Sequence, residues 1–177
     1  MTYASTYGEI LPSGMSIIIK DLNEMNQFTN DDVMYDLGCG VGKIVCQFAY
    51  ETICKKCIGI ELGITRHQKS IIALDSMKNA QLNNANKIQF IHGNILEKTQ
   101  WCNDGTILFI NAICFPEEVW IQLEKLIEQN VNKFKTIFLF GPLFDSSIID
   151  DNYDFALLNV PATWCDSINM ARYTKKK

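Results

Sequence analysis

A chain of 177 residues, 47% of them hydrophobic, can bury one substantial core and is close to the usual size of a single domain. Its formal net charge at pH 7 is −4. A surface of this sign repels the phosphate backbone of nucleic acids, so we expect no strong nucleic-acid binding by this chain alone.

The seven cysteines do not form the pattern of a disulfide-rich secreted domain. Their number is odd, most lie within apolar runs, and no signal-peptide pattern precedes them. Cys54 and Cys57 have the spacing of a zinc knuckle but lack a second pair to complete four ligands, so we expect buried thiols and no metal. No apolar stretch is long enough to span a membrane. These features predict an intracellular protein, cytoplasmic or nuclear.

Short apolar runs rich in β-branched residues alternate with helical patterns along the chain. This alternation is typical of parallel strands joined by helical crossovers. Ser13 is the expected N-cap of a leading helix, and a second helix is expected over residues 42–53. A capping box of Thr65 and Gln68 predicts the start of a third helix, and Pro116 begins a fourth. The predicted parallel strands are residues 33–37, 58–60, 87–92, 106–111 and 136–140.

The C-terminal part changes character, because the extended runs 155–160 and 168–174 have no helix between them. We expect them to pair antiparallel as a hairpin. The predicted fold is therefore α/β and Rossmann-like, with a mostly parallel seven-stranded sheet and helices on both faces. One domain would span residues 1–177, with a leading segment and helix in 1–30, a ligand-binding core in 31–141 and the C-terminal β-hairpin in 142–177.

The loop Asp36-Leu37-Gly38-Cys39-Gly40-Val41-Gly42 connects the first predicted strand to the next helix. A glycine-rich turn here presents backbone N–H groups and the positive end of a helix to a ligand at the carboxyl edge of the sheet. The dinucleotide fingerprint requires glycine where Lys43 stands, and the phosphate-binding P-loop requires Ser or Thr where Ile44 stands. The remaining pattern, an acid followed by three alternating glycines, suits a ligand with a cationic amino-acid part. S-adenosyl-L-methionine has that shape.

Two further polar residues stand at strand ends. Glu61 closes the second predicted strand, where a carboxylate can accept both ribose hydroxyls of such a ligand. Asn94 follows the third strand, and its side-chain carbonyl can accept a hydrogen bond from the adenine amine. Their position at the same edge of the sheet as the glycine loop favours a cofactor site over a structural turn.

Three features indicate a family. Tyr7-Gly8-Glu9 precedes the leading helix, Gly59-Ile60-Glu61 accompanies the glycine loop, and Asn111-Ala112-Ile113-Cys114-Phe115 follows the fourth strand. On these motifs the chain resembles the class I, seven-strand methyltransferases over nearly its whole length. More specifically, it resembles the disruptor-of-telomeric-silencing (DOT) family of histone lysine methyltransferases.

The resemblance implies roles for these residues. Tyr7 and Glu9 would fold over the methionine end of S-adenosyl-L-methionine, and Asn111, Phe115 and Tyr7 would form the catalytic entrance to the methyl group. The remaining positions would bind the cofactor, and they are Asp36, Gly38, Cys39, Gly40, Gly42, Glu61, Asn94 and Ile95.

The acceptor implied by the resemblance is a protein lysine, possibly on a histone. The chain departs from the family at several positions, since Lys43 replaces a glutamine and Asn94-Ile95 replaces an Asp-Phe pair. Two alternatives therefore stay open. One is a class I methyltransferase of a non-histone protein or a small molecule, and the other is a non-catalytic subunit that binds S-adenosyl-L-methionine.

Overall fold

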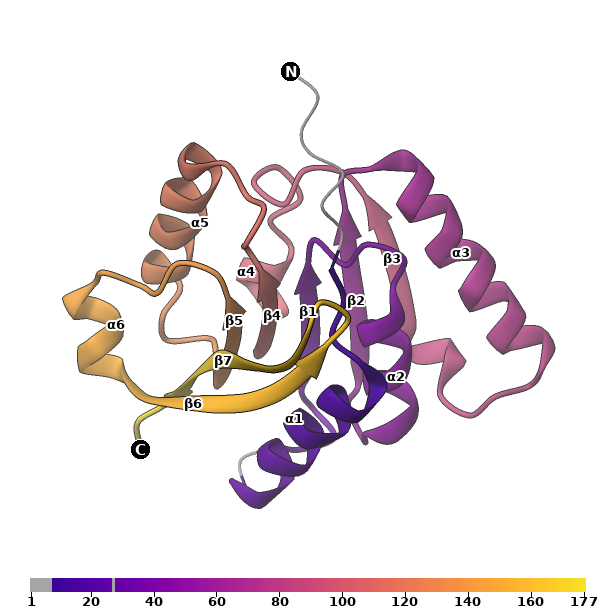
Figure 1. Ribbon diagram of the computed structural model, residues 1–177, viewed down its shortest axis with the longest axis horizontal. Coiled ribbons are helices and arrows are strands. Elements are labelled where there is room, and N and C mark those ends of the chain that lie inside the picture. The colour runs from indigo at the N-terminus through magenta and orange to yellow at the C-terminus, as the bar shows by residue number, and fades with distance from the viewer. Residues whose placement is uncertain (1–7, 27) are drawn as a thin grey trace.

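The structure is a computed structural model that describes residues 8–26 and 28–177. Its centre is a seven-stranded sheet in the order β3-β2-β1-β4-β5-β7-β6 (Figure 1). Strands β1 to β5 run parallel to one another, and β7 pairs antiparallel with both β5 and β6. The strand bounds are β1 Val33–Leu37, β2 Lys56–Glu61, β3 Ile88–His92, β4 Ile107–Asn111, β5 Thr136–Phe140, β6 Tyr153–Ala162 and β7 Cys165–Lys175.

Helices cover both faces of the sheet (Figure 1). On one face lie α1 (Pro12–Glu24), α2 (Lys43–Glu51) and α3 (Ile64–Asn79), which share a buried cluster with Met34 of β1. On the other lie α4 (Trp101–Asp104), α5 (Glu117–Gln129) and α6 (Ser147–Asn152), which pack with Tyr35 and Leu37. Successive residues of β1 thus enter opposite cores, as the two-residue period of a strand requires. A short 3₁₀ helix, Ala85–Lys87, precedes β3.

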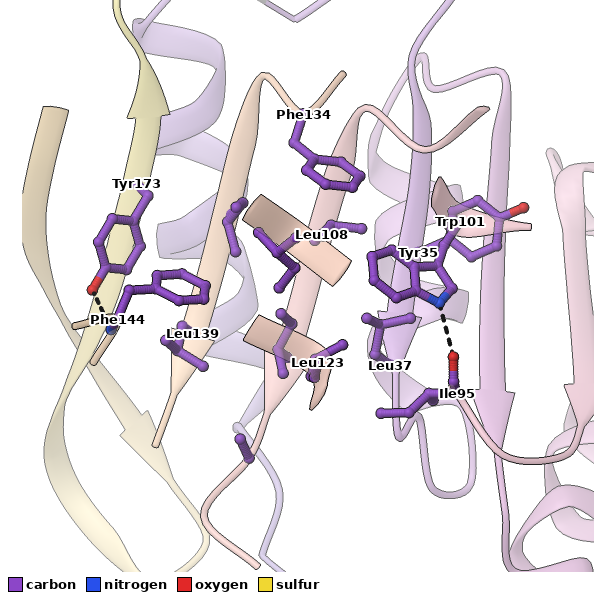
Figure 2. Packing of buried hydrophobic residues seen from close by; sticks show 14 of the residues in the cluster. Tyr35, Leu37, Ile95, Trp101, Leu108, Leu123, Phe134, Leu139, Phe144 and Tyr173 are labelled. Atoms are coloured by element: carbon purple, nitrogen blue, oxygen red, sulfur yellow. Dashed lines mark hydrogen bonds between the residues drawn. The ribbon is translucent and has the colours of Figure 1, made fainter. Parts of the chain in front are cut away.

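Aromatic side chains fill the core under α4, α5 and α6 (Figure 2). Trp101 is fully buried and donates its indole N–H to the carbonyl oxygen of Ile95 at 3.0 Å. Phe144 lies against Tyr173 of β7 with ring centroids 4.9 Å apart, and its backbone N–H donates to the Tyr173 hydroxyl. A large apolar side chain with its polar atom satisfied is stable in such a core, and the Phe144–Tyr173 contact holds the segment before α6 against β7.

The predicted fold is confirmed, with five parallel strands, a terminal antiparallel hairpin and helices on both faces. Two predicted helix caps are wrong. Helix α1 begins at Pro12 with Leu11 as N-cap, because proline already has the backbone angle of a first helical turn, and no side chain caps it. Helix α3 begins at Ile64, before Thr65, because the Glu61 carboxylate accepts the N–H of Gly63 and turns the chain into the helix early.

Three short elements were not predicted: the 3₁₀ helix, α4 and α6. Each is six residues or shorter, so it does not complete the apolar period by which a helix is recognised in a sequence. Only α6 carries a local signal, since the Ser146 hydroxyl accepts the N–H of Ile149 as an N-cap.

The tip of the β6-β7 hairpin holds the segment that precedes α1. Ile10 forms an antiparallel bridge with Ala162. The N–H of Thr163 donates to the carbonyl oxygen of Glu9 at 2.8 Å, and the N–H of Leu11 donates to that of Pro161 at 3.1 Å. Segments from opposite ends of the chain therefore meet beside the carboxyl edge of the parallel strands.

Candidate functional site

The glycine loop leaves β1 in a conformation that other residues rarely adopt. Gly38, Gly40 and Gly42 have φ values of 93°, 57° and 83°. The N–H groups of Gly38 and Cys39 both donate to the carbonyl oxygen of Ile60, at 2.9 and 3.0 Å, which ties the loop to the end of β2. A Cβ on Gly42 would come within 2.5 Å of the Phe90 ring. The loop therefore needs glycine both for its backbone angles and for close packing.

Glu61, the last residue of β2, is buried, and both oxygens of its carboxylate accept hydrogen bonds. Oε2 accepts the N–H of Gly40 at 2.9 Å. Oε1 accepts the N–H of Gly63 at 2.6 Å and the Nε and Nη2 groups of Arg66 at 2.9 and 2.7 Å. One carboxylate thereby links the glycine loop, the end of β2 and the start of α3. Sequence reasoning found Glu61 but missed Arg66, because no helical or strand period marks an ion-pair partner.

Asp36, at the end of β1, is only 2% exposed. Burial, and secondarily the charge of Glu61, raises the pKa of its carboxyl group to about 8 from an ordinary value of 3.8. A buried carboxylate of this kind is favoured by a cationic ligand and disfavoured without one. The loop thus presents an acidic group that a positively charged ligand would stabilise in its ionised form.

A small cavity opens at this edge of the sheet. It is bounded by Asp36, Gly38 and Gly40 of the loop, by Asn111 at the end of β4, and by residues 8–10 of the leading segment. The Phe115 ring lies over the loop, where its Cζ would be 3.2 Å from a Cβ on Gly38. The structure thus brings together, from three separate segments, most of the residues expected at the methionine end of the cofactor. Tyr7 lies outside the described residues.

A family model described as "Histone methylation protein DOT1" matches residues 2–143 of the chain. The chain belongs to the DOT1 family. It is 31% identical to "Histone-lysine N-methyltransferase, H3 lysine-79 specific" of Caenorhabditis elegans over 134 residues, which cover 72% of this chain and 14% of that protein. It is 29% identical to "Protein-lysine N-methyltransferase" of Saccharolobus islandicus (strain REY15A) over 58 residues, 33% of this chain and 36% of that protein.

The chain thus matches much less than half of the length of these curated relatives. Among solved structures, an RNA methyltransferase from Salinibacter ruber in complex with S-adenosyl-L-homocysteine is similar in fold. Its TM-score is 0.56 at 18% identity, with 90% of this chain and 91% of that chain covered. This likeness confirms the class I methyltransferase fold.

Cys39 and Lys43 of this DOT1-family chain contact other segments around the loop. Cys39 is buried with its Sγ where a Cβ on Gly59 would lie, so Gly59 leaves room for it, and burial raises the pKa of the thiol. Lys43, the first residue of α2, forms an ion pair with Glu9 of the leading segment. This pair adds an electrostatic contact to the backbone contacts that hold residues 9–11 at the hairpin tip.

Asn94 and Ile95 follow β3 but do not line the cavity. The side-chain oxygen of Asn94 accepts the N–H of Leu96 at 3.0 Å and retains a second lone pair. Ile95 is buried, and its carbonyl oxygen accepts the Trp101 indole N–H. Their role at an adenine pocket stays a prediction.

Two histidines lie near Glu61. His67 of α3 and His92 of β3 have ring centroids 5.4 Å apart, and His92 stands opposite Glu61 in the sheet. The His92 Nε2 atom lies 3.0 Å from the carbonyl oxygen of Leu62. Burial, and then the charge of His92, lowers the pKa of His67. The parallel register of β2 and β3 places His92 beside Glu61, and the first turns of α3, which follows β2, bring His67 next to it.

Asp104 and Cys54 make structural hydrogen bonds. Asp104 accepts the Tyr35 hydroxyl at 2.9 Å, and the thiol of Cys54 donates to the carbonyl oxygen of Asp32 at 2.8 Å. Cys54 and Cys57 are both fully buried, as the sequence predicted. Within residues 8–26 and 28–177, no group of three His, Cys, Asp or Glu side chains could hold a metal ion. No helix in the described part of the chain is long and apolar enough to span a membrane.

Proposed function

We propose that this protein is an S-adenosyl-L-methionine-dependent methyltransferase that acts on a lysine of a protein. The observation that carries the proposal is the pair of buried carboxyl groups, Asp36 and Glu61, at adjoining strand ends around the glycine loop. Membership of the DOT1 family supports the methyltransferase chemistry, and both curated relatives are named as lysine methyltransferases.

The residues present fit the cofactor. Gly38 and Gly40 line the cavity at φ values of 93° and 57°, and the absence of a side chain at both positions lets the amino-acid part of a ligand approach the backbone. Asp36 can balance the positive charge of that part, because a cationic partner favours the ionised form of a carboxyl group whose pKa is raised by burial. Glu61 would accept ribose hydroxyls, and Asn94 with Ile95 would flank the adenine. Glu9 and Lys43, already paired, would face the methionine end.

The chain contributes to catalysis mainly by positioning the reacting groups. S-adenosyl-L-methionine, when bound, supplies an electrophilic methyl group for in-line displacement. The chain must hold a nucleophile in line with that group, and alignment alone accounts for a large part of such catalysis. We assign this to the Asn111 side-chain carbonyl, which can orient an amine, and to Phe115 and Tyr7 as walls of a narrow entrance.

The acceptor amine must also lose its proton. A lysine ammonium has an ordinary pKa of about 10.4 and carries no lone pair, so it cannot attack until it is neutral. An apolar entrance lowers the pKa of a buried lysine by desolvation, and the proton would pass to water. The position of Phe115 over Gly38 supports an apolar wall at this point.

The acceptor protein is the part of the proposal that most needs a test. We propose a histone first, with another protein second, acting in the nucleus or cytoplasm. Purified protein would be incubated with methyl-labelled cofactor and, separately, core histones, nucleosomes and a whole-cell extract. We expect label on a protein band that yields methylated lysine on acid hydrolysis, and loss of that label with Glu61→Ala.

The other outcomes decide between the alternatives. Label on a small molecule alone would replace the protein acceptor. An absence of label in all three incubations, with cofactor binding intact by calorimetry, would identify a non-catalytic binding subunit.

A further inference from the structure

Arg66 forms an ion pair with Glu61, the carboxylate proposed to bind the cofactor ribose. It lies in the first turn of α3, five residues after Glu61. Its Nε and Nη2 atoms lie 2.9 and 2.7 Å from the same oxygen, Oε1 of Glu61. The Glu61 side chain is 5% exposed and the Arg66 side chain 49% exposed. The ion pair thus joins a fixed buried acid to a base that can move into water.

The two oxygens of Glu61 differ in what they can still accept. Each carboxylate oxygen has about two lone-pair sites. Oε2 accepts one described donor, the N–H of Gly40, and so retains a site. Oε1 accepts three donors, the N–H of Gly63 and two groups of Arg66. A ribose hydroxyl can therefore bind Oε2 directly but can bind Oε1 only after Arg66 has left.

Gly63 leaves space for the Arg66 guanidinium beside Glu61. A Cβ on Gly63 would come within 2.8 Å of Nη2 and 2.9 Å of Cζ of Arg66. Gly63 has a φ of −76°, an ordinary value for any residue, so its backbone does not require glycine. The absence of a side chain at position 63 leaves space for the guanidinium next to Glu61. The contact also compensates a buried charge that would otherwise be costly.

We propose that Arg66 is a competitor of the ribose, which holds Oε1 of Glu61 in the cofactor-free protein and leaves when the cofactor binds. Arg66 thereby weakens cofactor binding. It also reduces the difference in affinity between the cofactor and an analogue that lacks the ribose hydroxyl bound by Oε1. The inference rests on the ribose role proposed above for Glu61. It does not depend on which acceptor is methylated.

The test is calorimetry with S-adenosyl-L-homocysteine and its 2′-deoxy and 3′-deoxy analogues. The proteins are the wild type, Arg66→Met, Arg66→Lys and Glu61→Ala. Lys69→Met serves as the control, because it removes one exposed positive charge from the same helix. Thermal unfolding of each variant establishes that it is folded.

We expect Arg66→Met to bind S-adenosyl-L-homocysteine about fivefold more tightly than the wild type, which is the scale of one partly exposed ion pair. Arg66→Lys should gain less, since an ammonium still contacts Oε1. The analogue lacking the hydroxyl at Oε1 should bind the wild type and Arg66→Met equally, because it never displaces the guanidinium. Lys69→Met should bind all three ligands as the wild type does.

The Arg66 proposal is overturned if Arg66→Met binds S-adenosyl-L-homocysteine more weakly, which would show that Arg66 positions Glu61 for the ligand. It is also overturned if Arg66→Met leaves the affinities of all three ligands unchanged. Glu61→Ala separates this failure from that of the ribose assignment. If Glu61→Ala binds all three ligands as the wild type does, Glu61 has no ribose role. If it binds weakly while Arg66→Met shows no gain, only the Arg66 proposal fails.

Discussion

The carboxyl groups of Asp36 and Glu61 lie at the ends of the neighbouring parallel strands β1 and β2, and both are buried. Their charges are compensated very differently. Glu61 accepts two backbone N–H groups and an arginine, whereas the pKa of Asp36 is raised to about 8 by burial and by Glu61 itself. Without a ligand, the site therefore holds one paired carboxylate and one carboxyl group that retains its proton near neutral pH.

The Asp36 carboxyl should make the cofactor-free protein less stable as the pH rises. Its pKa is higher in the folded protein than in the unfolded chain, so the folded state binds more protons between about pH 4 and about pH 8. The free energy of unfolding then falls through this window. Asp36→Asn should remove this dependence of the free energy of unfolding on pH. At pH 8 its free energy of unfolding should be higher than that of the wild type by at least about 1.4 kcal/mol, the value of one pKa unit. Urea denaturation at pH 5 and pH 8 measures both slopes, and parallel slopes would contradict the prediction.

Cofactor binding should release a proton from Asp36. A cationic ligand favours the ionised carboxylate, so affinity for S-adenosyl-L-methionine should rise between pH 6 and pH 8 and then level off above about pH 8. The proton count comes from calorimetry in buffers of different ionisation enthalpy. Asp36→Asn should bind more weakly and lose this release. A release that persists unchanged in the variant would assign the proton to another group.

Glu61→Ala should weaken binding of S-adenosyl-L-homocysteine at least tenfold, since hydrogen bonds to a charged group contribute about 1.5–3 kcal/mol each. Calorimetry gives the affinity directly. Glu24→Ala is the matched control. Glu24 is an exposed acid at the end of α1, and its ion pair with Lys20 lies at the surface. Equal affinities of Glu61→Ala and the wild type would remove the ribose assignment.

Gly42→Ala should destabilise the fold as well as the site. The φ of +83° costs a non-glycine residue about 1–2 kcal/mol, and the new Cβ would also press on the Phe90 ring. We expect a loss of about 2 kcal/mol or more in the free energy of unfolding. Combining Gly42→Ala with Phe90→Leu should remove the steric contribution to this loss and leave the contribution from the backbone angle. If the double variant loses the sum of the two single losses, the ring contact does not contribute.

The strands and the glycine loop could be predicted because their signals are local. Strand β1 supplies Met34 to one core and Tyr35 to the other, so all of its residues except Asp36 are apolar and the run is visible in the sequence. The acid and glycines after it occupy fixed positions in the turn. Their role in cofactor binding is a prediction from this spacing, and so is that of Glu61 at the end of β2.

The contacts that tune the site could not be predicted in this way. Arg66 meets Glu61 because α3 starts earlier than its apparent capping box, and His67 of α3 meets His92 of β3 because α3 begins directly after β2, the neighbour of β3. Trp164 gives no sign of proximity to Gly8, more than 150 residues away in the chain. Such contacts depend on how helices and strands pack in three dimensions, and the periodicity of the sequence does not encode that packing.

Trp164 should control the order of the leading segment. A Cβ on Gly8 would overlap the six-membered ring of the indole, so the ring lies directly against the Gly8 backbone. The N–H of Glu9 also donates to the Thr163 hydroxyl at 3.1 Å. Trp164→Ala should therefore speed hydrogen exchange at the amides of residues 9–11 and leave those of β1 unchanged, as expected for local opening.

Leu157→Ala is the matched control for Trp164→Ala, because Leu157 is an exposed apolar residue on the same hairpin. It should leave exchange at residues 9–11 as in the wild type. Because Glu9 contributes to the cavity next to Asp36, Trp164→Ala should also weaken S-adenosyl-L-homocysteine binding by a few fold. Faster exchange without any loss of affinity would mean that the leading segment covers the site but contributes no binding energy.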